Sequence, residues 1–222
     1  MIADYAYSTG SRALFSSVVL SLAACSVLQT PPRPVVYDFG PGAVVQAATS
    51  TPTLPTLVLA EVETTAALDA TLVLYRLGYS DAQQLRPYAQ ARWSMPPAQL
   101  VRQRLREILG QQRVVLSPGE SIAPGTPTLI LRIGLEEFSQ WFESADKSSG
   151  LVRLRATLSQ TAATTSSGAE RLVAQRSFVL QRSSTTADAA GGAQALAGAT
   201  DAAIAELDQW LQASQARASN TK

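Results

Sequence analysis

Cys25 is the side chain in this sequence whose type and position point to a defined chemical reaction. It is the single cysteine among 222 residues, and it directly follows Leu22, Ala23 and Ala24. A thiol is a strong nucleophile once deprotonated, and small residues before it let the chain enter a peptidase site. A lone cysteine forms no internal disulfide. The pattern therefore predicts a cysteine that is modified rather than one that holds the fold together.

The run before Cys25 is typical of an export signal. Residues 13–24 are apolar or small and uncharged, and Arg12 precedes them. Twelve helical residues rise about 18 Å, which is short of the roughly 30 Å needed to span a membrane. We therefore expect residues 1–24 to be a removable signal peptide. The alternative at this point is a plain signal peptide with no lipid attachment, or a cysteine buried in a helix.

The four residues Leu22–Cys25 resemble the lipobox of bacterial lipoprotein precursors. The resemblance implies cleavage between Ala24 and Cys25 and attachment of acyl chains such as palmitate to Cys25. Two such chains hold a protein stably on a membrane. Ser26 stands where an Asp would favour retention in the inner membrane. The resemblance thus implies an outer-membrane lipoprotein that faces the periplasm of a Gram-negative bacterium.

Patterns for catalysis and for metal or nucleotide binding are missing from the sequence. The chain has no histidine, which removes Ser-His and Cys-His pairs and most zinc sites. Phosphate-binding glycine loops and the G-x-S-x-G motif are also missing. Glu136 and Glu137 are neighbours on a predicted strand and point to opposite faces. Because these patterns are missing, we expect no enzyme, no cofactor and no metal site. The formal net charge of only +1 is not that of a nucleic-acid-binding protein, so we expect no nucleic-acid partner.

Aromatic and arginine residues gather in one part of the sequence and are candidates for a partner interface. They are Tyr75, Arg76, Tyr88, Arg92 and Trp93. Tyrosine, tryptophan and arginine are enriched where proteins bind one another tightly. The same residue types also fill protein cores, so core packing remains the alternative. Both interpretations require two adjacent strands that bring these side chains together.

The elements that would position these residues follow a simple order of four strands, a helix, four strands and a helix. The strands are predicted at 35–40, 57–62, 71–79, 85–93, 113–117, 128–138, 150–160 and 171–181. One helix begins within 94–97 and runs to about 109, where Gly110 follows, and a second covers about 188–213. This order predicts an α/β fold: a mixed, largely antiparallel sheet with two main helices packed on it in a single compact domain.

The domain organisation follows from these segments. Residues 25–34 form the lipidated N-terminus and a proline-rich tether, because three prolines favour extended backbone there. Residues 35–213 form the folded domain, and 214–222 form a polar tail.

The block 72–109 resembles the ABC-type transport auxiliary lipoprotein family, which includes the Pqi-type intermembrane transport lipoproteins. The matching features are Tyr75-Arg76 near a strand end, Tyr88 in the next strand, and the step from Trp93 to Pro96-Pro97 into a helix. That helix carries spaced leucines: Leu100, Leu105 and Leu109. The short tether and the final helix also fall where the family has them, so the resemblance covers most of the chain after Cys25.

The resemblance implies a non-catalytic lipoprotein that works with an MCE-domain protein, an ABC permease and an ATPase to move lipids between membranes. It leaves open whether the chain forms a homo-oligomer. Two other functions compete with it: a structural or assembly lipoprotein of the cell envelope, such as a pilotin, and a hydrolase whose site the sequence does not reveal.

Overall fold

The computed structural model describes residues 33–42, 54–120, 128–161 and 170–219. The chain divides into two units, Met1–Arg33 and Pro34–Lys222, and all the helices and strands described lie in the second. The predicted cleavage site, Ala24 and Cys25, lies outside the described residues.

The elements follow the predicted order of four strands, a helix, four strands and a helix. The strands are β1 (Val35–Tyr37), β2 (Leu57–Thr64), β3 (Leu72–Leu77), β4 (Asp81–Trp93), β5 (Val115–Leu116), β6 (Leu129–Phe142), β7 (Ser148–Thr161) and β8 (Glu170–Ser183). The described helices are α2 (Pro97–Leu109), α3 (Ala189–Ser219) and the 3₁₀ turn η2 (Ala66–Leu68).

Strand β6 organises the sheet because it pairs along both of its edges. One edge forms a long antiparallel ladder with β7, which in turn pairs with β8. The other edge is shared by two shorter strands, with β2 parallel to the first half of β6 and β3 parallel to its end. Beyond these, β4 and β1 extend the sheet from β3, and β5 extends it from β2. The two long ladders make the mixed sheet largely antiparallel, as the sequence predicts.

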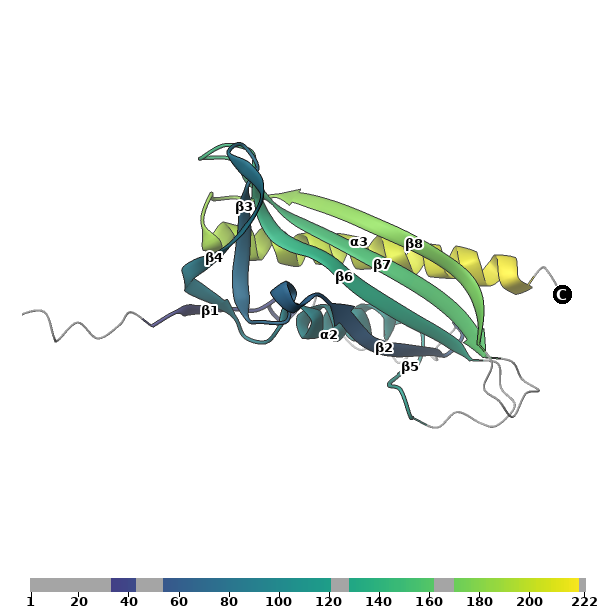
Figure 1. Cartoon of the computed structure of the whole chain (residues 1–222). Helices are drawn as coiled ribbons and strands as arrows, with labels where there is room; N and C mark the ends of the chain where they lie inside the picture. Colours follow the sequence, from purple (N-terminus) through teal and green to yellow (C-terminus); the bar gives the residue numbers. More distant parts are fainter. Residues whose placement is uncertain (1–32, 43–53, 121–127, 162–169, 220–222) are drawn as a thin grey trace, which may run out of the picture. The chain divides into compact units, whose positions relative to one another are not determined.

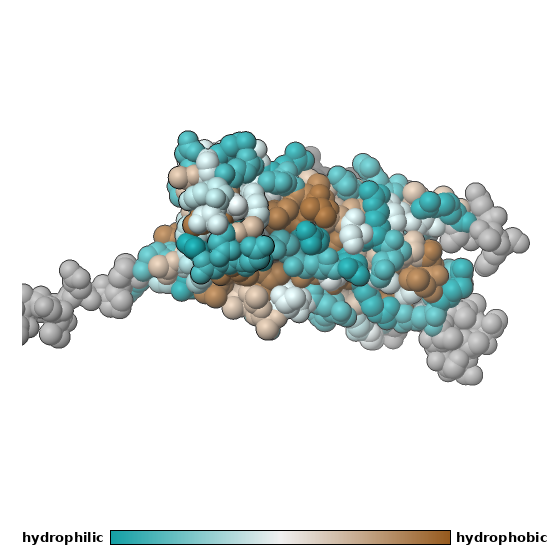
Figure 2. Space-filling view, turned by 45° about the horizontal axis from the view of Figure 1, so that its top comes forward, coloured by the Kyte–Doolittle hydropathy of each residue, from teal (hydrophilic) through white to brown (hydrophobic). Residues whose placement is uncertain are grey.

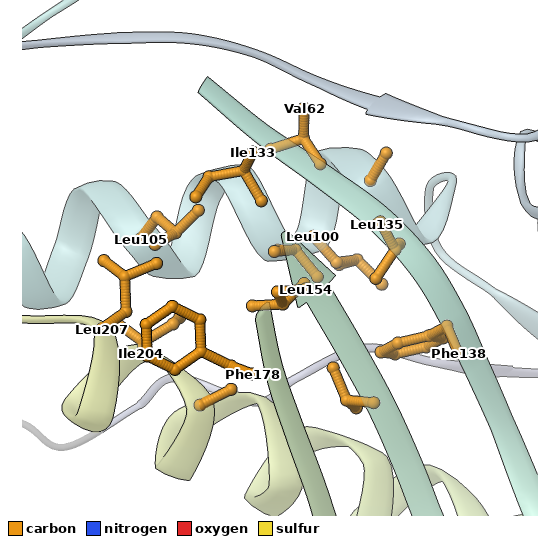
Figure 3. Close-up of a cluster of buried hydrophobic side chains, with 14 of the residues drawn as sticks. Val62, Leu100, Leu105, Ile133, Leu135, Phe138, Leu154, Phe178, Ile204 and Leu207 are labelled. Carbon is orange, nitrogen blue, oxygen red and sulfur yellow. The ribbon is translucent and has the colours of Figure 1, made fainter. Parts of the chain in front are cut away.

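The core lies between one face of this sheet and the two helices (Figure 1). Along the first half of β6 every second residue is buried, which places Leu129, Leu131, Ile133 and Leu135 on the helix side. Leu100 and Leu105 of α2 and Ile204 and Leu207 of α3 meet this face (Figure 3). Burying each such side chain contributes about 1.5–3 kcal/mol, so the cluster is the main stabilising feature.

A glycine allows α3 to lie close to the sheet. A Cβ built on Gly150 of β7 would come within 2.5 Å of the backbone of Ala195 and Leu196. Only a residue without a side chain fits so close a contact between a strand and a helix. Around it, the buried residues Ala199, Ala203 and Leu207 continue the predicted apolar stripe of α3 along β7 and β8.

The structure differs from the sequence prediction at several boundaries. β4 begins at Asp81 rather than at the predicted residue 85. β6 continues to Phe142, beyond the predicted end at 138. α3 continues to Ser219, beyond the predicted end at 213. In each case a neighbour extends the element: β3 pairs with Asp81 and Phe142, and sheet packing supports α3.

The side chains of β4 do not simply alternate between the two faces of the sheet. Leu72 of β3 pairs with Arg92, whereas Leu74 pairs with Pro87, so β4 carries extra residues in between. Such an irregularity moves the following side chains to the other face of a sheet. Pro87 lies where β4 has an open edge within the described residues, since β1 pairs only with residues 91–93.

Candidate functional site

The five residues predicted for a partner interface lie close together on β3 and β4 but do not form one surface. Neighbouring strand residues point to opposite faces, so Tyr75 and Arg76 separate. The irregularity in β4 brings Tyr88 to the Tyr75 side, and it leaves Trp93 in the core.

Tyr75 and Tyr88 belong to a half-buried aromatic cluster that ends in a polar network. Their ring centroids are 4.6 Å apart, and Phe142 lies 5.8 Å from the ring of Tyr75. The Tyr88 hydroxyl donates to Oε1 of Gln140 at 2.8 Å, and Nε2 of Gln140 donates to Ser148 Oγ at 2.7 Å. Burial, with a smaller contribution from Tyr75, raises the pKa of the Tyr88 phenol well above its usual value of 10.0. The phenol therefore stays a neutral hydrogen-bond donor.

Arg76 fastens the β3–β4 hairpin to β6 on the opposite face. Its guanidinium lies 3.1 Å from Oε2 of Glu137, and both side chains are less than one-fifth exposed. The same guanidinium donates to the backbone carbonyls of Ala82 and Gln83. These contacts use most of its donors, and they leave little of the group for a partner.

The side chains of Arg92 and Trp93 also make contacts within the fold. Arg92 donates to the carbonyls of Tyr88 and Ala91, at 2.8 and 2.7 Å, where the register of β4 shifts. Trp93 is only 2% exposed and packs edge-on against Phe39. A partner cannot reach so buried a ring in this structure, and the prediction of a partner-facing Trp93 is therefore not supported. Core packing, the alternative that the sequence left open, describes it.

A buried arginine that we did not predict joins three parts of the fold. Arg104 of α2 is 5% exposed, and its Nη2 donates to the carbonyl of Phe39 at 2.5 Å. Its Nη1 lies 3.1 Å from Glu107, and its Nε lies 3.2 Å from Oδ1 of Asp201 in α3. Burial raises the pKa of the Asp201 carboxyl, and the charge of Arg104 opposes this rise. Arg104 thus ties the segment after β1 to both helices.

One sequence signal for Arg104 exists. It lies three residues after Val101 and next to Leu105, so it falls on the apolar stripe of the predicted helix. A charged residue in such a stripe must find partners inside the protein.

Arg113, between α2 and β5, is a second buried cation. Its Nη2 lies 2.5 Å from Oδ1 of Asp208 in α3, and burial lowers the pKa of the Arg113 guanidinium. Nothing in its local sequence indicates this contact.

The described residues hold no group of three or more histidine, cysteine, aspartate or glutamate side chains placed to bind a metal ion. None of the helices in the described part of the chain is long and apolar enough to cross a membrane. The surface over the described elements is mainly hydrophilic on the side drawn in Figure 2, with separate apolar areas.

The comparison with protein families decides the general type of the protein. The model of the ABC-type transport auxiliary lipoprotein component matches residues 37–208, from the end of β1 to the second half of α3. The chain belongs to this family. The family description makes the protein an auxiliary component of a transport system, and the resemblance seen in the block 72–109 is confirmed.

Solved structures agree with the fold of this auxiliary lipoprotein. A Xanthomonas campestris protein of family DUF330 shares 20% identity, with 84% of this chain and 99% of that one covered, and the TM-score is 0.66. A second, uncharacterized protein shares 13% identity over 81% of this chain and 99% of the other, with a TM-score of 0.55. At these identities the likeness shows the fold alone. A search of curated proteins finds no match.

Proposed function

We propose that this auxiliary lipoprotein is anchored through acylated Cys25 to the periplasmic side of the outer membrane. There it serves as a non-catalytic partner of an MCE-domain protein, whose ABC permease and ATPase move lipids between the membranes. The family match over residues 37–208 carries the proposal, because it covers the whole folded core. The Leu22–Cys25 motif supports the anchor, since it stands directly before the family domain.

The contacts of the polar side chains support a binding role rather than a chemical one. Arg76 is paired with Glu137, Arg104 with Asp201, and Arg113 with Asp208. Each pair joins one element to another, so these charges are used to hold the fold. The protein would then act by binding a partner on the surface of its sheet.

The position of the domain relative to the anchor limits where a partner can be met. Ten peptide units separate Cys25 from Val35, and an extended chain spans at most about 3.6 Å per residue. The start of β1 would therefore lie within about 36 Å of the lipid headgroups. A partner from the inner membrane would have to come close to the outer membrane to reach the domain.

Labelling with radioactive palmitate tests the anchor. Cells that produce the full-length chain should yield a labelled protein that sediments with membranes, and Cys25→Ala should lose both the label and the membrane association. Ser26→Thr, next to the predicted cleavage site, is the matched control and should keep both. Label that persists in Cys25→Ala would overturn the proposed acylation.

Crosslinking in intact cells tests the transport partnership. The acylated protein should capture an MCE-domain protein, and the captured amount should fall when Cys25→Ala releases the chain from the membrane. Capture of secretin or pilus components in place of an MCE-domain protein would instead support the assembly role that the sequence left open. Fractionation of inner and outer membranes in the same cells checks the localisation.

A further inference from the structure

One edge of the sheet is long and open. Within the described residues β8 pairs with β7 alone, from Glu170 to Ser183. Figure 1 shows β8 as the outermost strand at its end of the sheet, with α3 behind it. The backbone groups on the far side of β8 therefore have no strand to pair with. An open strand edge of this length is a template for an additional strand.

Arginines line this edge on one face. Arg171, Arg176 and Arg182 stand opposite Gln160, Ala156 and Gly150 of β7. Ala156 is buried in the core, and a Cβ on Gly150 would touch α3, so this is the helix side of the sheet. The three arginines are nevertheless exposed. The described residues provide no ion pair for any of the three, and the Arg176 guanidinium lies 4.9 Å from the ring centroid of Phe178.

A groove continues the edge toward α3. It encloses about 460 Å³, and it is lined by Arg171, Val173, Gln175, Trp210 and Ser214, together with Ala174 and Arg217. Trp210 is 7% exposed and packs edge-on against Phe178, so it forms a rigid apolar floor. The groove thus combines an aromatic surface with a positive rim, which is the composition of a protein-binding site.

On the other face of the same ladder, two arginines form ion pairs with carboxylates. Arg132 pairs with Glu170 at 2.6 Å, and Arg155 pairs with Glu136 at 2.7 Å. The formal net charge of the whole chain is only +1. The three arginines of the β8 edge have no ion pair among the described residues and are exposed, which leaves their guanidinium groups able to meet the carboxylates of a partner.

We propose that the open edge of β8 binds an extended acidic segment of a partner protein as an additional strand. Its backbone would pair with β8, and its carboxylates on one face would meet Arg171, Arg176 and Arg182. Backbone pairing supplies the affinity in this mode of recognition, and side chains on alternate positions supply the specificity. A second copy of this chain is a poor occupant, because pairing two β8 edges would bring like-charged arginines together.

A binding experiment with the full-length acylated protein in detergent tests this proposal. The probe is a fluorescent 14-residue peptide of alternating glutamate and threonine, followed by fluorescence anisotropy at low salt. We expect saturable binding that weakens about fivefold with each of Arg171→Gln, Arg176→Gln and Arg182→Gln, as for a partly screened charge pair. The triple variant should lose about 100-fold. The same peptide with glutamine for glutamate, or with alternate backbone nitrogens methylated, should bind at least tenfold more weakly.

A matched triple variant separates this site from general attraction to a basic protein. Arg86→Gln, Arg106→Gln and Arg153→Gln together remove the same charge away from the β8 edge, and they should leave the affinity within twofold. An equal loss in both triple variants would overturn the proposal, as would no binding of the glutamate peptide at millimolar concentration. Tight binding of the N-methylated peptide would exclude strand addition. Self-association that the β8 triple variant abolishes would show that the occupant is a second copy.

Discussion

At the scale of single residues, we expect substitution of the buried Arg104 to destabilise the fold, because its guanidinium contacts polar groups from three parts of the fold. Replacing it by methionine keeps the apolar stem and removes every polar contact. The carbonyl of Phe39 and the carboxyl of Asp201 would then lose their partner. We expect the free energy of unfolding to fall by about 3 kcal/mol, the usual cost of breaking a buried charged contact.

Urea unfolding of the Pro34–Lys222 unit measures this effect, with Arg106→Met, on the same helix, as the control that should change stability by less than about 0.5 kcal/mol. The loss should also depend on pH. Without Arg104, burial raises the pKa of Asp201 further, so the folded state binds a proton more readily than the unfolded state. The stability lost in Arg104→Met relative to the wild type should therefore shrink as the pH falls from 7 toward 4. A pH-independent loss would contradict the assigned contact with Asp201.

Tyr88 provides a second test at this scale. Tyr88→Phe removes the hydroxyl that donates to Gln140, a side chain with 0% exposure. The unfolding free energy should fall by about 1 kcal/mol, the net value of a hydrogen bond. In an ultraviolet titration of the wild-type protein, Tyr88 should ionise well above the usual pKa of 10.0, because burial raises its pKa, and Tyr88→Phe should remove this late signal. Tyr75→Phe is the control, and loss of the last-titrating signal in this variant instead would contradict the assignment.

How far the sequence predicts this site differs from residue to residue. The alternation of apolar residues along 128–138 correctly predicts which face of β6 is buried, since strand geometry alone decides it. The same argument fails for Tyr88 and Trp93, because the irregular pairing of β3 with β4 depends on contacts between segments distant in the sequence. Aromatic composition indicated a cluster, but it could not tell an interface from a core.

At the scale of elements, the close contact between β7 and α3 predicts opposite effects for two glycines. Gly150→Ala places a methyl group against the backbone of α3, which must move, and we expect a loss of about 1–3 kcal/mol. Gly198→Ala adds a methyl group with nothing within 4 Å in the interior of α3, and it should gain about 0.5–1 kcal/mol through helix propensity. Thermal unfolding of both variants checks the pair. Equal shifts in melting temperature would contradict the packing.

A charged contact joins three neighbouring strands and predicts a pH dependence. Glu170 of β8 accepts hydrogen bonds from Arg132 of β6 and Ser159 of β7, and the bond from Arg132 chiefly lowers the pKa of its carboxyl below 4.5. The folded state thus favours the ionised form, so the contact stabilises above pH 4.5 and is lost as the pH falls through the lowered pKa.

Glu170→Gln should accordingly lower the urea midpoint slightly at pH 7 and leave it unchanged near pH 3. The effect should be a fraction of a kcal/mol, because both side chains are partly exposed and salt screens them. Raising the salt concentration at pH 7 should reduce the difference. A difference that persists at pH 3 would show that the carboxylate charge is not its source.

At the scale of the whole molecule, the length of the segment between Cys25 and the folded domain limits the proposed encounter with a partner. Deleting Leu28–Arg33 leaves Cys25 and the residues before it unchanged, so acylation should continue. Crosslinking to the MCE-domain partner in cells should fall several-fold, because the domain is held nearer the membrane. Replacing the deleted residues by six glycines and serines should restore it. Failure of this replacement would show that the prolines themselves, rather than the reach, are required.

The pairing of β6 with strands from both halves of the chain has a consequence for how the protein is made. A ribosome produces the N-terminal half first, so β2 and β3 emerge before the strand that holds them. Strands β7 and β8 and helix α3, in contrast, follow β6 directly and form by contacts between near neighbours, which are fast to close. Until residue 142 has been synthesised, β3 has β4 beside it, but β2 and β3 still lack the edge of β6 with which they pair. The first half of the nascent chain therefore completes its part of the sheet only after the second half arrives.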